Sequence, residues 1–395
     1  MARNETVLWK LAGFYFLLFA YLGVFLPWLP PLLRARGFSP WLIGLALATV
    51  QLSRSLLPPL WGLLADRLRH QRRLLATAAM LAGASLMGLA LPGGRDAIFV
   101  WLFLHGLFLV PLFPLAEVIT LRTLGPRCER YGQVRLWGSV GFIVTTVGLG
   151  FGSELFGRSG EAGPWAMGLP LVLAGGLALT MPVARSLRRQ PPVPISALPA
   201  SRRLPGALFL LIVAAGLGQG SHGPYYAFFT IQLEDAGVGH GLISLLWGWG
   251  VAAEVLLMAV SHRLIARWGL RAAFRGALAL GCARWFLYAS QPGLVVLALG
   301  QTLHAASFAL LHVTTIQLAD RLTPTRCKVL GQSLVSAGAY GFGIGAGSFL
   351  AGRFAATLSY AGLYAAAAVT CLVALVVSLF LRDHSMHQGP MPRAS

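Results

Sequence analysis

The stretch LHAASFALLHVTTIQLADRLTPTRCKVLGQ (residues 303–332) matches LHGLFLVPLFPLAEVITLRTLGPRCERYGQ (residues 104–133) without a gap. The Leu-His pair, an arginine and the pattern RC…GQ coincide at an offset of 199 residues. Two further segments, LIGLALATVQLSRSLL (42–57) and LISLLWGWGVAAEVLL (242–257), align at an offset of 200. Leucine is common in any apolar segment, but histidine and cysteine are not. The repetition therefore indicates a chain built from two similar halves.

The composition is that of a membrane protein. The 395 residues are 56% hydrophobic and 11% charged, whereas soluble proteins carry about 25% charged residues. Twelve apolar segments are each near the ~17–25 residues needed to cross a bilayer. They lie at about 8–33, 40–63, 74–91, 96–121, 134–153, 165–184, 206–231, 242–262, 271–290, 293–320, 331–352 and 358–381.

The repeat and the segments together predict an all-α membrane protein with twelve transmembrane helices in two pseudo-symmetric six-helix bundles. The Pro- and Arg-rich stretch RSLRRQPPVPISALPASRRLP (185–205) is typical of a linker. We expect an N-terminal bundle at 1–184 and a C-terminal bundle at 206–395. Halves of equal orientation are related by an axis along the membrane normal, and transporters of this kind bind their substrate at the midplane between them.

The positive charge indicates the orientation in the membrane. The chain has 31 Lys and Arg against 12 Asp and Glu, a net charge of +19. Most of these cations lie in the termini and in the loops after even-numbered spans. Because positive loops stay in the cytoplasm, we expect a multi-pass protein of the inner (cytoplasmic) membrane with both termini cytoplasmic. The charge then reflects topology and contact with lipid, and nucleic acid is not expected as a partner.

Ionisable residues within spans are the first functional candidates, since they normally face the bundle interior or a cavity. Glu254, Arg284 and His304 lie twelve, thirteen and eleven residues into spans 8, 9 and 10. At ~1.5 Å per residue, each is within a turn or two of the midplane. Arg54 lies at the same level in span 2. These four side chains, from both halves, predict a site at one depth.

Two further expectations follow from the same helices. Glu117, near the end of span 4, and Arg135, at the start of span 5, are expected to pair, as a structural lock or as part of a gate or substrate site. The repeat makes His105 equivalent to His304, and we expect the two to face each other across the axis. His312 follows His304 by eight residues and projects about 80° away on an α-helix, so packing and site roles are both open.

Aromatic residues complete the candidate site. His222 lies in GQGSHGPYYAFF beside Gly220 and Pro224, where the helix is expected to bend or unwind, and with Tyr225 and Tyr226 it is expected to line a cavity. The other candidate ring contacts are Trp249 and Trp285. No clustered Cys and His spacing, P-loop, GxSxG or HExxH motif is found, so we expect no enzyme, no metal and no cofactor beyond a proton gradient.

One loop resembles a motif of the major facilitator superfamily. The segment GLLADRLRHQRR (62–73) is similar to G-x-x-x-D-R-x-G-R-R, with Gly62, Asp66 and Arg67 matching and Arg69 in place of the second glycine. In the family this loop helps to hold the cytoplasmic side closed. The resemblance therefore implies a gating role for these residues.

Longer segments resemble the phenylpropionate permease group, which is close to the lactose permease. They are YGQVRLWGSVGF (131–142), GPYYAFF (223–229), LLWGWGVAAEV (245–255), ARWFLYA (283–289) and QTLHAASFALLH (301–312). In the lactose permease, residues matching Glu117, Arg135, Glu254, Arg284 and His304 carry substrate binding and proton coupling. Ser307 stands where that relative has its proton-linked carboxylate, so the proton must be carried elsewhere.

These observations predict a secondary active transporter that carries a small organic solute with protons by alternating access and that functions as a monomer. Three core arginines against two glutamates favour an aromatic carboxylate, held by Arg54 or Arg284, while a sugar or a nucleoside stays open. Glu254 is expected to carry the proton and His304 to couple it. The alternatives are a proton-driven exporter of drugs or metabolites, and a non-transporting sensor or lipid-facing enzyme.

Overall fold

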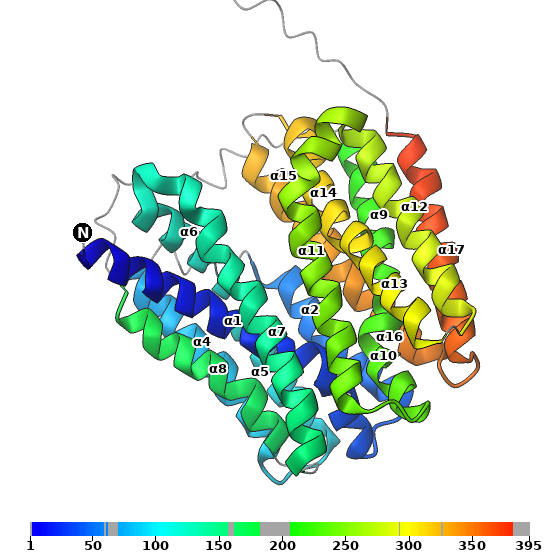
Figure 1. The fold of residues 1–395 in the computed structure, drawn as a ribbon, viewed down its shortest axis with the longest axis horizontal. Coiled ribbons are helices and arrows are strands. Elements are labelled where there is room, and N and C mark those ends of the chain that lie inside the picture. The colour runs from blue at the N-terminus through cyan, green and yellow to red at the C-terminus, as the bar shows by residue number, and fades with distance from the viewer. Residues whose placement is uncertain are drawn as a thin grey trace, which may run out of the picture.

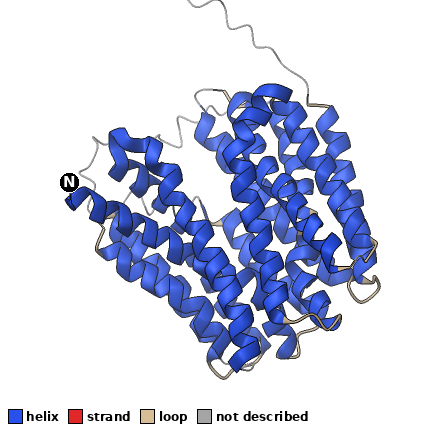
Figure 2. Cartoon of the chain, in the orientation of Figure 1, coloured by secondary structure: helices blue, strands red, loops and turns tan. Residues whose placement is uncertain are grey.

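The computed structural model describes residues 2–58, 61, 70–156, 162–181, 206–291, 293–324 and 327–381. Within these ranges every regular element is a helix (Figure 2). The expected linker at 185–205 and the motif residues Gly62, Asp66 and Arg67 lie outside the described residues.

In its described residues, the first half of the chain has seven α-helices and two 3₁₀ turns. They are α1 (Ala2–Ala35), α2 (Pro40–Leu56), α4 (Gln71–Met87), η1 (Gly88–Ala90), α5 (Arg95–Leu109), α6 (Leu112–Leu124), η2 (Gly125–Arg130), α7 (Tyr131–Phe156) and α8 (Ala162–Leu179). The second half supplies α9 (Gly206–Gly220), α10 (Gly223–Asp235), α11 (His240–Trp268), α12 (Leu270–Ala289), α13 (Leu294–His304), η4 (Ala305–Leu310), α14 (Leu311–Leu322), α15 (Lys328–Val335), η6 (Ser336–Gly343), α16 (Ile344–Phe354) and α17 (Tyr360–Leu379).

Many of these elements are suited to a membrane. In the described ranges, nine helical stretches are long and apolar enough to cross a bilayer. A shorter apolar helix covers Gly163–Leu179, and two other expected spans correspond to α2 and α12, which carry internal arginines. The chain is thus a multi-pass helical membrane protein, while the count of twelve crossings stays a prediction.

Apolar side chains form two buried clusters. The first is built mainly from α1, α2, α4, α5 and α8, with Tyr15, Leu75 and Leu171 at its centre. The second is built mainly from α9, α11, α12 and α17, and includes Phe274 and Trp285. Figure 1 shows the corresponding groups of helices beside each other, the first in blue to green and the second in green to red.

The two groups meet along α1, α2 and α7 on one side and α10, α11 and α16 on the other. The start of α1 and the end of α17 lie toward the same end of the molecule, which we call the terminal end; the opposite one is the distal end (Figure 1). At the distal end small residues bring helices close: a Cβ on Gly44 of α2 would lie 2.8 Å from the Cα of Gly352 of α16. Such close approach needs glycine.

Three interruptions of regular α-helix shape the second half. α9 ends at Gly220 and α10 begins at Gly223, which confirms the bend expected around His222. The segments η4 and η6 are π-helical. Because π turns are rare and frequently occur at functional sites, they draw attention to the residues beside them.

Candidate functional site

Arg284 of α12 is fully buried, with no exposed surface. Its Nη1 lies 2.8 Å from Nδ1 of His304, and its Nη2 donates to Oε1 of Gln301 at 3.3 Å. Its Nη1 also donates to Oγ of Ser307 at 3.4 Å. An arginine placed so deeply stabilises the fold only if its charge is compensated nearby.

That compensation comes through His304. An arginine donates and never accepts, so Nδ1 of His304 must be the acceptor and its proton must lie on Nε2. Nε2 in turn lies 2.8 Å from Oε1 of Glu254, to which it donates. Arg284, His304 and Glu254 thus form one hydrogen-bonded chain across α12, α13 and α11. The cation lies at its buried end, and Glu254 retains 14% side-chain exposure at the other.

Aromatic rings enclose the guanidinium. The centroid of Tyr225 lies 4.5 Å from the central carbon of Arg284, and that of Tyr288 lies 5.3 Å away. Faces of aromatic rings attract a cation without neutralising it. Gln301, which is also fully buried, ties this wall together because its Nε2 donates to the hydroxyl oxygen of Tyr225 at 3.1 Å.

The break between α9 and α10 places His222 against the same cluster. The ring of His222 lies 5.0 Å from that of Trp285 and 5.7 Å from that of His304. Its Nδ1 donates to the carbonyl oxygen of Gly218 at 3.2 Å. Its buried Nε2 has no hydrogen-bond partner among the described residues. The break between the helices therefore places a buried imidazole nitrogen beside Trp285 and His304 without a hydrogen-bond partner in the described structure.

The first half contributes Arg54 from α2. Its Nη1 donates to Oε1 of Gln51 at 3.3 Å, and within the described ranges no carboxylate forms an ion pair with it. Tyr226 interacts electrostatically with Arg54, with Glu254 and with Arg284. Tyr226 is therefore near charged residues of both halves.

The expected pairing of Glu117 with Arg135 is wrong in this conformation. Glu117 is exposed and accepts from the hydroxyl of Tyr131 at 3.4 Å. The guanidinium of Arg135 lies 3.9 Å from the ring centroid of Phe19 in α1, and no ion pair joins it to Glu117 in the described structure. The aromatic side chains of α1 attract this arginine, while Tyr131 occupies the glutamate.

The expectation that His105 faces His304 is also wrong. His105 is buried inside the first half, where Nε2 lies 2.7 Å from the hydroxyl of Tyr21 and Nδ1 lies 3.1 Å from the carbonyl oxygen of Ala82. The repeat is nevertheless visible in these contacts. Each histidine bonds to the third span of its own half and lies against aromatic rings of the first span of that half.

The two tryptophans near the start of α11 differ in burial. Trp249 is 49% exposed and donates to Oγ1 of Thr302 at 3.0 Å. Trp247, two residues earlier and therefore about 200° away on the helix, is buried with its ring 4.6 Å from that of Tyr225. The sequence carries no signal that distinguishes the two tryptophans, because both lie in the same apolar segment. Only the structure shows that Trp247 packs against Tyr225.

The π-helical segment changes the position of His312. An α-helix would separate His304 and His312 by about 80°. The i→i+5 pattern of η4 accommodates one extra residue, which reduces the separation to about 20°. His312 thus shares a face with His304, interacts electrostatically with Glu254 and Arg135, and lies 2.7 Å through Nδ1 from the hydroxyl of Tyr340 in η6.

Comparisons with known proteins agree with this architecture. The model of the MFS_1 like family matches residues 8–366. A probable 3-phenylpropionic acid transporter of Escherichia coli (strain K12) is 30% identical over 319 residues, covering 79% of this chain and 82% of the relative. The maltose permease of Geobacillus stearothermophilus is 28% identical over 382 residues and covers 95% of each chain.

Solved structures show the same fold at lower identity. The nucleoside transporter NupG aligns with a TM-score of 0.76 at 16% identity, over 94% of this chain and 97% of that one. A bacterial homologue of the iron transporter ferroportin, solved in an inward-facing state, aligns with a TM-score of 0.68 at 16% identity, over 96% and 98%.

Proposed function

Since the chain belongs to the MFS_1 like family and is a small-solute transporter of the major facilitator superfamily, we propose that it is a proton-coupled symporter of an aromatic carboxylate. The terminal end faces the cytoplasm in this proposal. The observation that carries it is the hydrogen-bonded chain from Arg284 through His304 to Glu254.

The proton site is Glu254. With Glu254 ionised, its charge balances that of Arg284 through the neutral imidazole between them. Burial disfavours a lone charge, so adding a proton to Glu254 leaves Arg284 uncompensated and creates a demand for an anion. The same proton removes the repulsion that an ionised Glu254 exerts on an approaching carboxylate. Proton and anion therefore favour each other's binding.

The substrate carboxylate is bound by Arg54. Three arginines, Arg54, Arg135 and Arg284, contribute to the centre against Glu117 and Glu254, which leaves one positive charge in excess. Arg54 makes a single hydrogen bond, of 3.3 Å to a neutral side chain, whereas Arg284 contacts three polar side chains and Arg135 lies against the ring of Phe19. A guanidinium fork binds a carboxylate through two parallel hydrogen bonds.

The ring of the substrate is expected to contact the aromatic side chains around Tyr226. Tyr226 and Trp247 stack at 6.4 Å between centroids, and His222 stacks on Tyr226 at 6.0 Å. The relative named for 3-phenylpropionic acid supports an aromatic acid. A sugar or a nucleoside, suggested by other relatives, would leave the charge that protonation of Glu254 adds uncompensated, which is why a carboxylate is favoured.

Transport requires that the site open alternately to each side. We assign this movement to rocking of two bundles, residues 1–184 and 206–395, about the charged centre. The centre has the same net charge in two states. In one, Glu254 is protonated and substrate is bound; in the other, Glu254 is ionised and the site is empty. The change between the two access conformations costs less free energy in these two states than in a state with only the proton or only the substrate bound. This difference couples the flux of substrate to the flux of protons.

The test uses purified protein in liposomes and labelled 3-phenylpropionate. An inward proton gradient should drive accumulation in the wild type. Glu254→Gln should lose gradient-driven accumulation but retain exchange of labelled for unlabelled substrate, since exchange needs no net proton movement. Accumulation that persists in Glu254→Gln would contradict the assignment of the proton. Arg54→Gln should lower substrate affinity about tenfold or more, and an unchanged affinity would contradict the assignment of the carboxylate.

The same vesicles distinguish the second candidate, a proton-driven exporter of drugs or metabolites. An exporter would move substrate against the proton flow, so a proton gradient directed into the vesicles would deplete them of preloaded substrate. Proton-driven accumulation favours the symporter.

A further inference from the structure

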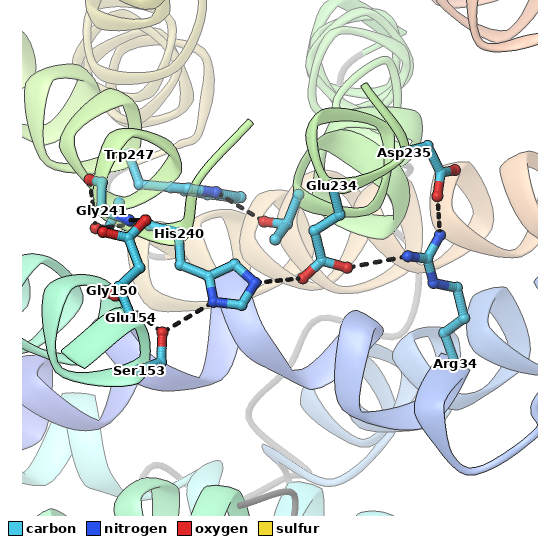
Figure 3. A network of polar contacts seen from close by, with 11 residues as sticks. Arg34, Gly150, Ser153, Glu154, Glu234, Asp235, His240, Gly241 and Trp247 are labelled. Carbon is cyan, nitrogen blue, oxygen red and sulfur yellow. Dashed lines mark hydrogen bonds and ion pairs between the residues drawn. The ribbon is translucent and has the colours of Figure 1, made fainter. Parts of the chain in front are cut away.

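A network of polar side chains joins the two halves at the distal end (Figure 3). Arg34, in the last turn of α1, lies 3.1 Å through Nη2 from Oε2 of Glu234 and 2.5 Å through Nη1 from Oδ1 of Asp235, both in the last turn of α10. On the other side of α10, Glu154 of α7 accepts from the backbone N–H of Gly241 at 2.8 Å. We call these contacts, together with those of His240, the distal latch.

His240 lies at the centre of the distal latch, between Glu234 and Ser153 (Figure 3). Its Nε2 lies 3.4 Å from Oε1 of Glu234, and its Nδ1 lies 2.9 Å from Oγ of Ser153 in α7. The edge of its ring also meets Trp28 of α1, with centroids 5.2 Å apart. One imidazole thus connects helices of the second half with two helices of the first.

The hydrogens of this network can be counted. The hydroxyl of Ser153 has a single hydrogen, and this oxygen already donates to the carbonyl oxygen of Gly150 at 2.8 Å. Nδ1 of His240 must then donate to Ser153, while Nε2 donates to the carboxylate of Glu234. Both ring nitrogens carry hydrogen only in the imidazolium. In the neutral ring one of these three bonds is lost: the bond of His240 to Glu234, the bond of His240 to Ser153, or the bond of Ser153 to Gly150.

We infer that His240 is a proton-binding site of the distal end, and that a proton bound there holds the two halves together on that side. Its charged surroundings favour this. Glu234 and Asp235 of α10 and Glu154 of α7 carry negative charge near it, against Arg34 of α1. The His240 side chain is 17% exposed, so solvent protons reach it.

The direction of the effect follows from linkage. Because the proton binds more tightly when the latch is closed, lowering the pH on the distal side increases the closed fraction, and raising it favours opening. The bond that the proton adds corresponds to a shift of about three- to tenfold in the ratio of closed to open molecules. This inference is independent of proton-coupled transport through Glu254.

The experiment measures the separation of the halves directly. Spin labels are attached at Asp96→Cys and Ala356→Cys in a protein whose four native cysteines are replaced by serine. Pulsed electron–electron double resonance then measures the distance between the two labels, at the distal end, between pH 5 and pH 8. All measurements carry Glu254→Gln, which removes the midplane carboxyl from the titration. His240→Gln is compared with His262→Gln, an exposed histidine near the other end of the same helix.

The short distal distance should gain population as the pH falls, both in the parent and in His262→Gln. His240→Gln should abolish this response. Ser153→Ala, which removes the acceptor from the opposite half, should weaken it without altering the histidine itself. A response that persists in His240→Gln, a response of opposite sign, or no response in the parent would each overturn the inference.

Discussion

At the scale of single residues, Gln301 connects the buried cation to its aromatic wall. Its Oε1 accepts from Arg284 and its Nε2 donates to Tyr225. Gln301→Leu preserves the volume but leaves Nη2 of Arg284 and the hydroxyl of Tyr225 buried without this bond, which costs about 1–3 kcal/mol of stability for each unsatisfied group. The melting temperature should fall by several degrees, whereas Gln317→Leu, at an exposed position of the same span, should leave it nearly unchanged. Equal melting temperatures of the two variants would contradict this role.

The two tryptophans of α11 give a second test at this scale. Trp247 is buried against Tyr225, while Trp249 is half exposed. Trp247→Leu should lower the affinity for an aromatic acid by about three- to tenfold, since a ring–ring contact contributes about 0.5–1.5 kcal/mol beyond its area. Trp249→Leu should leave affinity unchanged. Binding is measured by calorimetry on purified protein, and a larger loss in Trp249→Leu would contradict this assignment.

Charged candidates could be predicted from the sequence, but their partners could not. Arg284, His304 and Glu254 stand out because ionisable residues are costly within spans, and the structure joins all three in one chain. Glu117 and Arg135 also stand out, yet cation–ring contacts with α1 replace their ion pair. Gln301 is uncharged and lies in an ordinary apolar run, so the sequence gives no sign that it is fully buried and bonded to two site residues.

At the scale of helices, hydrophobic length predicts where helices lie but not how they are wound. The break at His222 was predictable because glycine and proline flank it. The π turns η4 and η6 were not, since no local motif distinguishes AASFAL from an α-helical segment. The turn η4 moves His312 onto the face of His304, and a prediction based on 3.6 residues per turn therefore gave the wrong angle.

Glycine spacing controls the contact of α7 with α11. A Cβ on Gly150 would overlap Oγ of Ser244 and lie 2.6 Å from the carbonyl oxygen of His240, whereas a Cβ on Gly148 would meet nothing within 4 Å. Gly150→Ala should therefore push the helices apart and lower the closed fraction at the distal end. Gly148→Ala should leave that fraction unchanged. The spin-label distances between positions 96 and 356 measure both, and equal distances in the two variants would contradict the packing argument.

At the scale of the whole molecule, the repeat predicted two similar halves, and the contacts of His105 and His304 reflect that similarity. The halves differ in what those contacts hold. His105 bonds to a tyrosine and a backbone carbonyl, whereas His304 bonds to an arginine and a glutamate. The repeat places a histidine at an equivalent point of each half, but only in the second half do charged side chains bond to it. A repeat in sequence therefore predicts the arrangement of helices better than it predicts a symmetric site.

The ratio of molecules closed at the distal end to molecules open there should also depend on ionic strength, because Arg34 forms its ion pairs only while the distal end is closed. Arg34 is 38% exposed and Asp235 45% exposed, so the pair that they form is screened and contributes about 0.2–1 kcal/mol. Arg34→Ala should lower the ratio of closed to open molecules about two- to fivefold. Arg353→Ala removes the same charge at the same end and should not change the ratio. In the described structure Arg353 contacts the ring of Phe354 but forms no ion pair.

Raising the salt concentration from about 0.05 to about 0.5 M should also lower the ratio of closed to open molecules in the wild type, since screening weakens exposed pairs. The same change should affect Arg34→Ala much less. If salt opened Arg34→Ala as much as the wild type, other charges would control the distal end and Arg34 would be only a surface contact.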